Sequence, residues 1–421
     1  MKFFSVMYQT SNSKGQELVA QRMVKWARKL GYEAWLITSV YHDDNTVIPV
    51  DKVWSREGYV ILDDDPSTGL PVIRVDSFKV SWPPRRIMFR DFIAVLRRID
   101  KTLGVDFIVT HSTLWNGPIE TARWVLWKNI VKSLGGAAKP TIYGHMSHYQ
   151  PPDPVRYSLI ERAYRMAWNI SSLPAILKSA DLVLCTTGIE AEDMMSYYGA
   201  RPEQIHIFPG GLDDDLAALI DNAKPDAFLE KYNIGKDKLI IAYLGTVEER
   251  KNPLAVVKVA KKLEKLRDVV FVIAGRPGSQ WEDVLREARD LENVVITGEL
   301  STELKASLIK ASYLNIIMSK LEALGITQIE FMYGGVPVIS SGTYGQKWLI
   351  THNVDGIIVK GPDDIEGAAK AIEELVKNPN KREYLSANAR KKASGFLMSK
   401  LVEQLMTRAK SLLIEKEKQA H

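Results

Sequence analysis

The chain has 421 residues, 46% of them hydrophobic, which is enough for two α/β domains that each bury a core of their own. The net charge of +5 is too small for a nucleic-acid-binding protein, and no apolar run approaches the roughly 20 residues of a membrane span. The only cysteine, Cys185, excludes an internal disulfide and favours a reducing, cytoplasmic compartment.

Strand-like apolar runs alternate with helical patterns in the first half of the chain, and this alternation predicts a parallel α/β sheet. No Gly-x-Gly-x-x-Gly motif follows the first run, which argues against a dinucleotide-binding oxidoreductase. The expected strands are 3–8, 33–38, 59–62, 72–75, 106–110, 180–187 and 204–208, and the expected helices are 15–30, 117–134, two stretches between 155 and 178, and 188–198.

The segment 82–101 combines basic residues with apolar and aromatic ones. Six of its residues are Arg or Lys, against two Asp, and the pattern predicts a basic amphipathic helix. Such a helix packs its apolar side on its own domain, which is the interpretation we prefer, or it lies on an anionic membrane surface or against an anionic acceptor.

A polar, proline-containing stretch from Asp213 to Asp237 separates this half from a second series of strands and helices. The apolar run 239–244 predicts a central parallel strand, and Asn252 as N-cap with Pro253 predicts the start of the next helix. Further strands are expected at 269–274, 294–297, 313–318 and 336–339, and helices at 253–266, 326–333, 361–377, 381–392 and 396–416.

Two glutamates bracket the helix that begins after Gly325. Glu322 lies in the loop at the carboxyl end of a strand, where open parallel sheets bind ligands, and Gly325 lets backbone N–H groups at the helix start face an anion. Glu330 lies about two turns further along. This arrangement suits a ligand with hydroxyls at both ends and negative charge between them, such as a nucleotide sugar. Two solvated glutamates of an ordinary strand–helix unit are the alternative.

The stretch from Ser319 to Ile339 resembles the glutamate, seven residues, glutamate signature of the family 4 retaining glycosyltransferases. The matching residues are Ser319, Glu322, Gly325, Glu330, Gly335, Pro337 and Val338. The resemblance implies the α/β GT-B fold, with two Rossmann-like parallel-sheet domains facing a central cleft and a C-terminal helix that crosses back to the first domain. It also implies that Glu322 hydrogen-bonds the donor sugar and that Glu330 holds the ribose diol.

In the first domain the resemblance draws attention to one loop and three histidines. Lys14 and Gly15 stand where the family has a glycine pair that lets the backbone approach the donor phosphate. A histidine at the end of a strand is expected beside the reacting sugar, and the spacing favours His145 but leaves His148 open. His111 ends another strand, either as an acceptor contact or as a hydrogen-bonded strand-end residue.

In the second domain the family has Gly-Arg, four residues and Lys, and the two cations hold the diphosphate. Lys251 matches, Thr246 replaces the arginine, and Arg250 is the residue that could restore the missing charge. Trp348 stands where the family has a further glutamate, and this difference weakens any inference about which sugar the donor carries. The other donor contacts implied by the resemblance are main-chain groups at Gly245, Gly275, Gly298, Ala323, Leu324 and Gly325.

The acidic run from Asp63 to Asp65 provides the main argument against this interpretation. Glycosyltransferases of the other architecture, GT-A, hold a divalent metal with an Asp-x-Asp at a strand end. Similar Asp pairs recur next to turn residues elsewhere in this chain, so we expect no metal ligands here.

Together, these residues and the resemblance predict a metal-independent retaining glycosyltransferase without a cofactor. Its donor is a UDP- or GDP-linked sugar, and its hydroxyl acceptor is lipid-linked, a glycan or a small molecule. The alternatives are a sugar-nucleotide epimerase or a phosphorolytic enzyme on the same fold, and a peripheral membrane protein with a degenerate site that uses residues 82–101. The expected domains are 1–218 on the acceptor side, 219–394 for the nucleotide sugar, and 395–421 as the returning helix.

Overall fold

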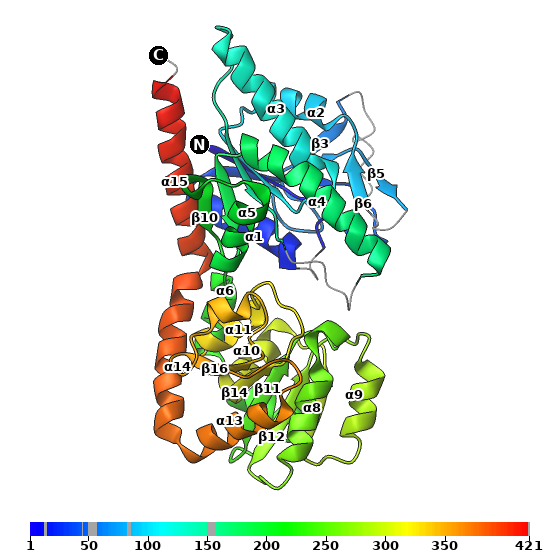
Figure 1. The fold of residues 1–421 in the computed structure, drawn as a ribbon, viewed down its shortest axis with the longest axis vertical. Coiled ribbons are helices and arrows are strands. Elements are labelled where there is room, and N and C mark those ends of the chain that lie inside the picture. Colours follow the sequence, from blue (N-terminus) through cyan, green and yellow to red (C-terminus); the bar gives the residue numbers. More distant parts are fainter. Residues whose placement is uncertain (12–14, 44, 49–56, 82–85, 150–156, 420–421) are drawn as a thin grey trace. The chain divides into compact units, whose positions relative to one another are not determined.

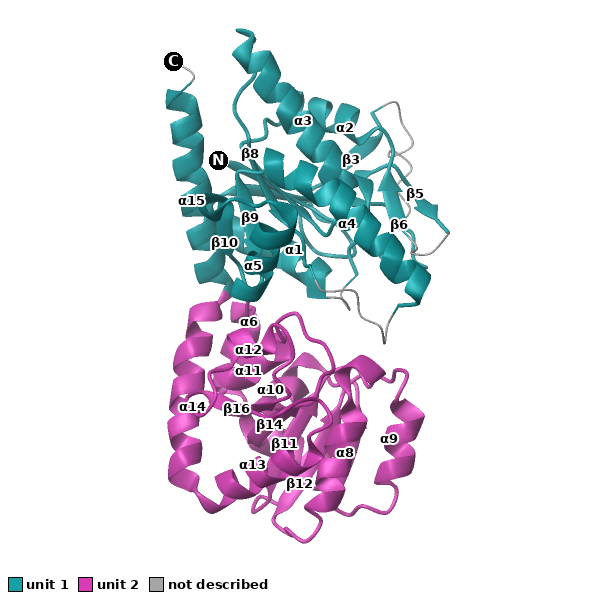
Figure 2. Ribbon diagram, in the orientation of Figure 1, with its two compact units in different colours: residues 1–210, 398–421 teal, residues 211–397 magenta. Residues whose placement is uncertain are grey.

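The computed structural model describes the chain except for residues 12–14, 44, 49–56, 82–85, 150–156 and 420–421. The chain forms two compact units (Figure 2). Unit 1 contains Met1–Gly210 and Met398–His421, and unit 2 contains Gly211–Leu397. The first division lies after Gly210 rather than after residue 218, because helix α6 (Asp214–Asn222) packs in unit 2 against helix α10 (Thr302–Ala311).

A sheet of eight strands forms the centre of unit 1 (Figure 1). From one edge to the other its strands are β10 (Ile205–Ile207), β9 (Leu182–Cys185), β8 (Ile142–Met146), β7 (Phe107–His111), β1 (Lys2–Val6), β2 (Glu33–Ser39), β4 (Val72–Val75) and β3 (Tyr59–Leu62). Only the pairing of β3 with β4 is antiparallel within this described sheet. Every residue of β7 and β8 is buried, as expected for central parallel strands covered on both faces.

Helices cover both faces of this sheet. On one face α1 (Gly15–Lys29) packs against α15 (Met398–Lys418), which returns the chain to unit 1 as the resemblance implies. The other face carries a row of helices that pack on their neighbours, and right-handed crossovers between parallel strands require this placement. The helices of that row are α2 (Phe92–Thr102), α3 (Asn116–Ser133), α4 (Leu159–Ser179) and α5 (Gly188–Tyr198).

The expected basic helix is shorter than predicted. Residues 82–85 lie outside the described residues, Arg86–Phe89 is the strand β6, and β6 pairs with β5 (Ser77–Val80) in a small antiparallel sheet. Helix α2 begins only at Phe92, because its apolar residues follow the helical period from that point. These apolar residues are buried in the core of unit 1, so the helix packs its apolar side on its own domain.

The region before β9 also differs from the expectation, because α4 is one continuous helix rather than two. Pro174 lies within it without ending it. The helix has 21 residues, yet among the described residues no helix combines the length and the apolar character that crossing a bilayer requires.

A sheet of six parallel strands forms the centre of unit 2. From one edge to the other its strands are β13 (Val294–Gly298), β12 (Val269–Ala274), β11 (Leu239–Leu244), β14 (Ser312–Ile317), β15 (Val338–Ser340) and β16 (Gly356–Ile358). Alternate side chains of β11 enter two different cores, with Ile240 and Ala242 in one and Ile241 and Tyr243 in the other. A strand that is apolar throughout therefore serves both faces of the sheet.

Two layers of helices complete unit 2. The first layer contains α6, α7 (Pro225–Lys231), α10, α11 (Ile326–Tyr333), α12 (Gln346–Leu349) and α14 (Pro379–Ala393), and the second contains α8 (Pro253–Lys262), α9 (Trp281–Ala288) and α13 (Ile365–Lys377). The predicted helix start at Pro253 is confirmed, but the side chain of Asn252 does not cap α8. Asn252 has a left-handed backbone with φ of 53°, and its Nδ2 donates to the carbonyl of Pro362 at 2.9 Å.

The acidic run after β3 supports the fold through Asp65. Its buried carboxylate accepts hydrogen bonds from Arg74 on β4, at 2.6 Å from Nε and 2.9 Å from Nη2, and from the hydroxyl of Ser67 at 2.6 Å. Burial alone would raise the pKa of Asp65, but the hydrogen bonds and charge of Arg74 and the bonds from Ser67 hold it below its ordinary value. Asp63 and Asp64 are exposed whereas Asp65 is buried, so the three carboxylates do not converge on one point.

We expect Asp65→Asn to destabilise unit 1 by about 3 kcal/mol at neutral pH, because Arg74 would be left as a buried charge without its counterion. Urea unfolding followed by circular dichroism measures this change, with Asp64→Asn as the exposed control. The folded-state pKa of Asp65 lies below the unfolded one, so its contribution is present above the unfolded pKa and is lost as the pH falls through the folded one. Equal unfolding midpoints for both variants would contradict this role.

Candidate active site

The carboxylate of Glu322 joins two loops of unit 2 that follow adjacent parallel strands. Glu322 lies in the loop between β14 and α11, and Lys251 lies in the loop between β11 and α8. The Lys251 ammonium donates a hydrogen bond to Glu322 Oε2, and the Ser319 hydroxyl lies 3.4 Å from the same oxygen. Both loops emerge at the carboxyl edge of the sheet, where open parallel sheets bind ligands.

Arg250 points toward the same carboxylate although it is adjacent to Lys251 in sequence. Residues 249–251 form a short 3₁₀ turn, and the Arg250 Nη1 atom lies 3.9 Å from Glu322 Oε2. Its guanidinium also donates to the carbonyl of Leu321 at 3.0 Å and to Glu248 Oε1 at 2.8 Å. The buried Arg250 Nε has no partner among the described residues. The structure therefore brings both predicted cations together.

These three side chains are mostly shielded from solvent, with 20% of Lys251, 16% of Arg250 and 10% of Glu322 exposed. Burial alone would raise the pKa of Glu322. The charges of Lys251 and Arg250 and the hydrogen bonds from Lys251 and Ser319 outweigh this effect and hold the pKa below its ordinary value. Glu322 is therefore a carboxylate at neutral pH.

Glycines let the backbone segments around this cluster approach one another closely. Gly275 has φ of 145°, and a Cβ there would lie 1.9 Å from the carbonyl oxygen of Gly245. A Cβ at Gly345 would lie 1.6 Å from the carbonyl oxygen of Ala323, and the N–H of Gly345 donates to the carbonyl of Glu322 at 3.0 Å. Gly298 ends β13, where its carbonyl accepts from the N–H of Gly275 at 2.8 Å. Two close backbone approaches therefore depend on glycine, that of Gly275 to Gly245 and that of Gly345 to Ala323.

The start of helix α11 follows Leu324 and Gly325 with the geometry expected from sequence. Gly325 occupies the N-cap position with φ of 95°, a left-handed conformation that favours glycine. Gln328, in the first turn, is fully buried, and neither its amide nitrogen nor its amide oxygen has a partner among the described residues. Sequence reasoning missed Gln328, because the sequence does not show that this polar side chain is buried.

Glu330 lies on α11 beside a cation that was not anticipated. The Nζ of Lys305, on α10, lies 2.7 Å from both carboxylate oxygens and donates its hydrogen bond to Oε1. The second oxygen has no hydrogen bond among the described residues, and the side chain of Glu330 is 3% exposed. Lys305 was missed because 25 residues separate it from Glu330 and no local pattern links them.

In unit 1 the three predicted histidines lie together at the carboxyl ends of β7 and β8. His111 Nε2 lies 3.0 Å from Ser5 Oγ, and its Nδ1 lies 3.0 Å from His148 Nε2. His145 Nδ1 lies 2.9 Å from Thr110 Oγ1, while its buried Nε2 has no partner among the described residues. His145 is fully buried, whereas His148 lies after the strand and is partly exposed.

Burial lowers the pKa of all three imidazoles. It lowers the pKa of His145 and of His148 to about 3, and that of His111 well below its ordinary value, with a further lowering of His111 and His145 by their neighbour His148. The cluster is therefore neutral at pH 7. No group of three or more His, Cys, Asp or Glu side chains placed to hold a metal ion occurs in the part of the chain that the structure describes.

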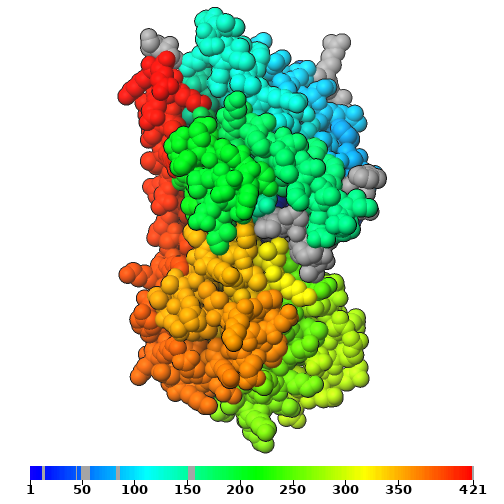
Figure 3. Space-filling view, in the orientation of Figure 1, coloured from blue at the N-terminus to red at the C-terminus, as the bar shows by residue number. Residues whose placement is uncertain are grey.

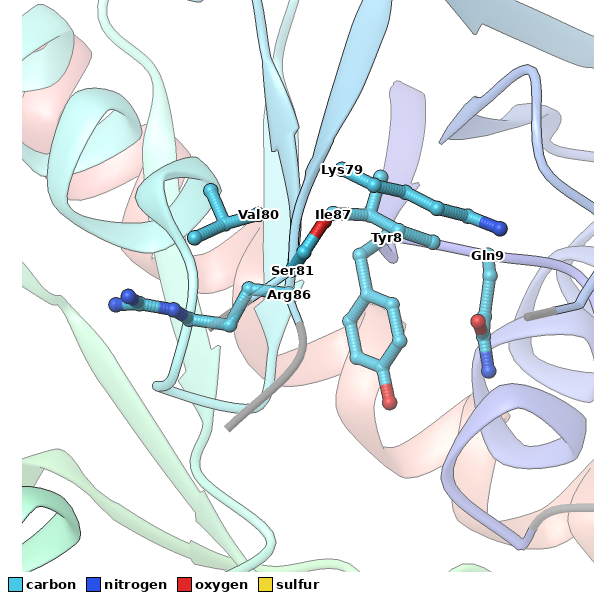
Figure 4. A pocket seen from close by; sticks show the side chains of 7 residues that line it. All are labelled: Tyr8, Gln9, Lys79, Val80, Ser81, Arg86 and Ile87. Carbon is cyan, nitrogen blue, oxygen red and sulfur yellow. The ribbon is translucent and has the colours of Figure 1, made fainter. Parts of the chain in front are cut away.

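A pocket of about 290 Å³ lies in unit 1 after the carboxyl end of β1 (Figure 4). Tyr8 and Gln9 line one side, and residues of β5 and β6, including Lys79 and Arg86, line the other. The guanidinium of Arg86 points away from Tyr8 and lies 4.9 Å from the ring of Tyr164. The pocket lies in unit 1, which the sequence assigns to the acceptor side.

The predicted loop before α1 is described only in part. Lys14 lies outside the described residues, and Gly15 is the first residue of α1 and is exposed. In the first turn of this helix, Glu17 is buried and accepts a hydrogen bond from Gln9 Nε2 at 2.7 Å. Gln9 thus connects the wall of the pocket to the helix that Gly15 begins.

Two family models match the chain in succession. The model described as glycosyltransferase family 4 matches residues 13–216, and the model described as glycosyl transferases group 1 matches residues 225–392. The first match corresponds closely to unit 1 and the second falls within unit 2.

Curated relatives include D-inositol 3-phosphate glycosyltransferase 1 of Catenulispora acidiphila, which is 25% identical over 250 residues, or 56% of this chain and 59% of the relative. The alpha-D-kanosaminyltransferase of Streptomyces kanamyceticus is 29% identical over 249 residues, or 58% of this chain and 63% of the relative. The chain thus spans somewhat more than half the length of these relatives.

Solved structures share the fold over nearly the whole chain. Sucrose-phosphate synthase from Thermosynechococcus elongatus has a TM-score of 0.71 at 18% identity, covering 99% of this chain and 100% of the other. HepE of Anabaena in complex with UDP and glucose has a TM-score of 0.64 at 16% identity, covering 98% and 100%. WaaG, a glycosyltransferase involved in lipopolysaccharide biosynthesis, has a TM-score of 0.65 at 15% identity, covering 96% and 98%.

We expect His145→Gln to make the stability of unit 1 less sensitive to acid. The unfolded chain protonates this histidine below its ordinary pKa of about 6.5, but the folded protein keeps it neutral down to about 3. The free energy of unfolding therefore falls as the pH is lowered from 6.5, by about 1.4 kcal/mol per pH unit from this residue. Urea unfolding between about pH 5 and pH 7 measures the slope, and an imidazole NMR signal of His145 titrating near pH 6.5 would contradict the prediction.

Doubly wound sheets form the centres of both units, parallel throughout except for β3 in unit 1, and the two family models together match most of the chain. The predicted GT-B fold is thus confirmed, and the chain belongs to the group 1 glycosyltransferases.

Proposed function

We propose that this chain is a retaining glycosyltransferase that transfers a sugar from a UDP- or GDP-linked donor to a hydroxyl acceptor. The observation that carries the proposal is the convergence of Lys251 and Arg250 on Glu322, next to the helix start at Gly325. HepE, a protein of the same fold, has been solved with UDP and with UDP-glucose, which supports a nucleotide-sugar donor.

The two cations suit the departing group of such a reaction. The bond between the anomeric carbon and the diphosphate oxygen breaks, the diphosphate leaves with the electron pair, and the acceptor oxygen bonds to the anomeric carbon. The acceptor proton passes to a phosphate oxygen of the leaving group. Lys251, Arg250 and the main-chain N–H groups at Ala323, Leu324 and Gly325 would stabilise the charge that develops on the diphosphate.

The two carboxylates of the site can recognise the hydroxyl groups of the donor, which carry no charge. Glu322 is ionised and can accept hydrogen bonds from the hydroxyls of the donor sugar. Lys305 Nζ lies 2.7 Å from both oxygens of Glu330, and the oxygen that has no hydrogen bond among the described residues could accept one from the ribose. Gln328 is fully buried beside Gly325 at the start of the same helix, so it can support this helix start but does not face the ligand.

We infer that His148, rather than the expected His145, touches a substrate. His148 is partly exposed, whereas His145 is fully buried and bound to Thr110. His111 holds His148 through a hydrogen bond of 3.0 Å and a stacked ring, which assigns it a positioning role. A neutral imidazole at this place can accept a hydrogen bond from a sugar hydroxyl without adding charge.

The reaction is tested by incubating the protein with UDP- and GDP-sugars and candidate acceptors, and by measuring nucleoside diphosphate release and product. Retention predicts that the anomeric configuration of the donor is kept in the product, and metal independence predicts that EDTA leaves the rate unchanged. An epimerised donor, or a reaction that requires inorganic phosphate, would identify an epimerase or a phosphorolytic enzyme instead. Cytoplasmic localisation stays a prediction from the single cysteine.

We expect Lys251→Ala to lower kcat by about 100-fold or more, because one preorganised donor to developing charge is worth about 3 kcal/mol of barrier. The rate of nucleoside diphosphate release measures this change. The control is Lys262→Ala, since Lys262 is 46% exposed and pairs with Glu366 elsewhere in unit 2. A Lys251→Ala enzyme as fast as this control would contradict the proposed role of the cation.

A further inference from the structure

Exposed apolar side chains of unit 1 are concentrated on two neighbouring helices, α3 and α4. At α3, Leu126, Ile130 and Leu134 are 52%, 49% and 82% exposed, and on α4, Met166 and Ile170 are 49% and 62% exposed. Single exposed apolar residues are ordinary on protein surfaces, but contiguous groups mark interaction surfaces. We call this group, with the residues between the two helices, the α3–α4 surface.

The two helices are neighbours, and of the exposed side chains named above Leu126 is the one that lines the groove between them. They pack on each other, and a groove of about 410 Å³ between them is lined by Leu126 from α3 and by Trp168 and Ala175 from α4. The α4 helix lies on the face of unit 1 that Figure 3 shows. Between 166 and 175 its exposed residues carry no charge, and they are Met166, Ala167, Ile170, Ser171, Pro174 and Ala175.

Basic residues border the apolar area on its α2 side. Arg97 and Lys101 are exposed on α2, and Arg123 is exposed on α3 at the groove. The Arg97 guanidinium lies 4.3 Å from the ring centroid of Trp127, which is itself 41% exposed. An apolar area beside cations and an exposed tryptophan complements the boundary between acyl chains and anionic headgroups.

We propose that the α3–α4 surface binds the face of a bilayer that contains anionic lipids. The apolar side chains enter the boundary between headgroups and acyl chains, and Arg97, Lys101 and Arg123 face the headgroup phosphates. A second copy of the chain is a poorer occupant, because a two-fold interface would bring the same cations of both copies together. The surface differs from the segment expected from sequence, since the apolar side of α2 is buried in the core.

Vesicle flotation tests this binding without any sugar substrate, so its result is independent of the proposed function. We expect the wild-type protein to float with phosphatidylcholine vesicles that contain about 30 mol% phosphatidylglycerol and to bind vesicles of phosphatidylcholine alone much more weakly. The triple variant Leu126→Gln/Ile130→Gln/Ile170→Gln should lower the partition coefficient by at least about tenfold, since three exposed apolar side chains are lost. The double variant Arg97→Ala/Arg123→Ala should lower it about fivefold per residue at low salt.

The control variant removes exposed apolar side chains from unit 2 instead of unit 1. Leu285 on α9 and Tyr384 on α14 are 39% and 56% exposed, so Leu285→Gln/Tyr384→Gln removes apolar surface elsewhere and should float like the wild type. Circular dichroism checks that each variant is folded. Wild-type protein that does not float with anionic vesicles, or a folded triple variant that floats as well as the wild type, would overturn the proposal. So would a lipid-free dimer that the triple variant abolishes, which would identify a second copy as the occupant.

Discussion

The organisation of unit 2 at its ligand edge depends on the ion pair between Lys251 and Glu322. A buried carboxylate is costly unless a cation compensates it, and this pair meets that requirement across two loops that follow adjacent strands. Arg250 is compensated in the same way by Glu248. Without a ligand, each cation therefore has a carboxylate partner, and a diphosphate entering the site would compete with these carboxylates for the same cations.

Much of the fold could be predicted because the information is local. Continuous apolar runs such as 239–244 and 269–274 identify buried parallel strands, and the start of α8 is marked by a proline at its first position. The loop around Glu322 was also predictable, since its glycines and glutamates belong to one short stretch whose residue types reflect backbone and ligand requirements. Lys251 and Arg250 were identified in the same way, but their convergence on one carboxylate was not.

The remaining features depend on contacts between residues far apart in the chain. Lys305 lies beside Glu330 only because α10 packs in the same layer as α11, and nothing in the sequence shows that Gln328 is buried. The basic segment was predicted to be one helix because β6 and α2 are both amphipathic. Its first part is a strand instead, because β6 pairs with β5. The relation between His145 and His148 likewise depends on where β8 ends, which is the least certain feature of any predicted strand.

The path of the chain has a consequence for how the protein is made. Unit 1 is interrupted by the whole of unit 2, since the chain leaves it after Gly210 and returns at Met398. During translation, the whole of unit 2 is synthesised before α15, so α1 lacks the helix that packs on it until the last part of unit 1 has been made. The side of α1 that α15 covers would stay exposed to solvent for that interval, so the packing of these two helices is one of the last steps in completing unit 1.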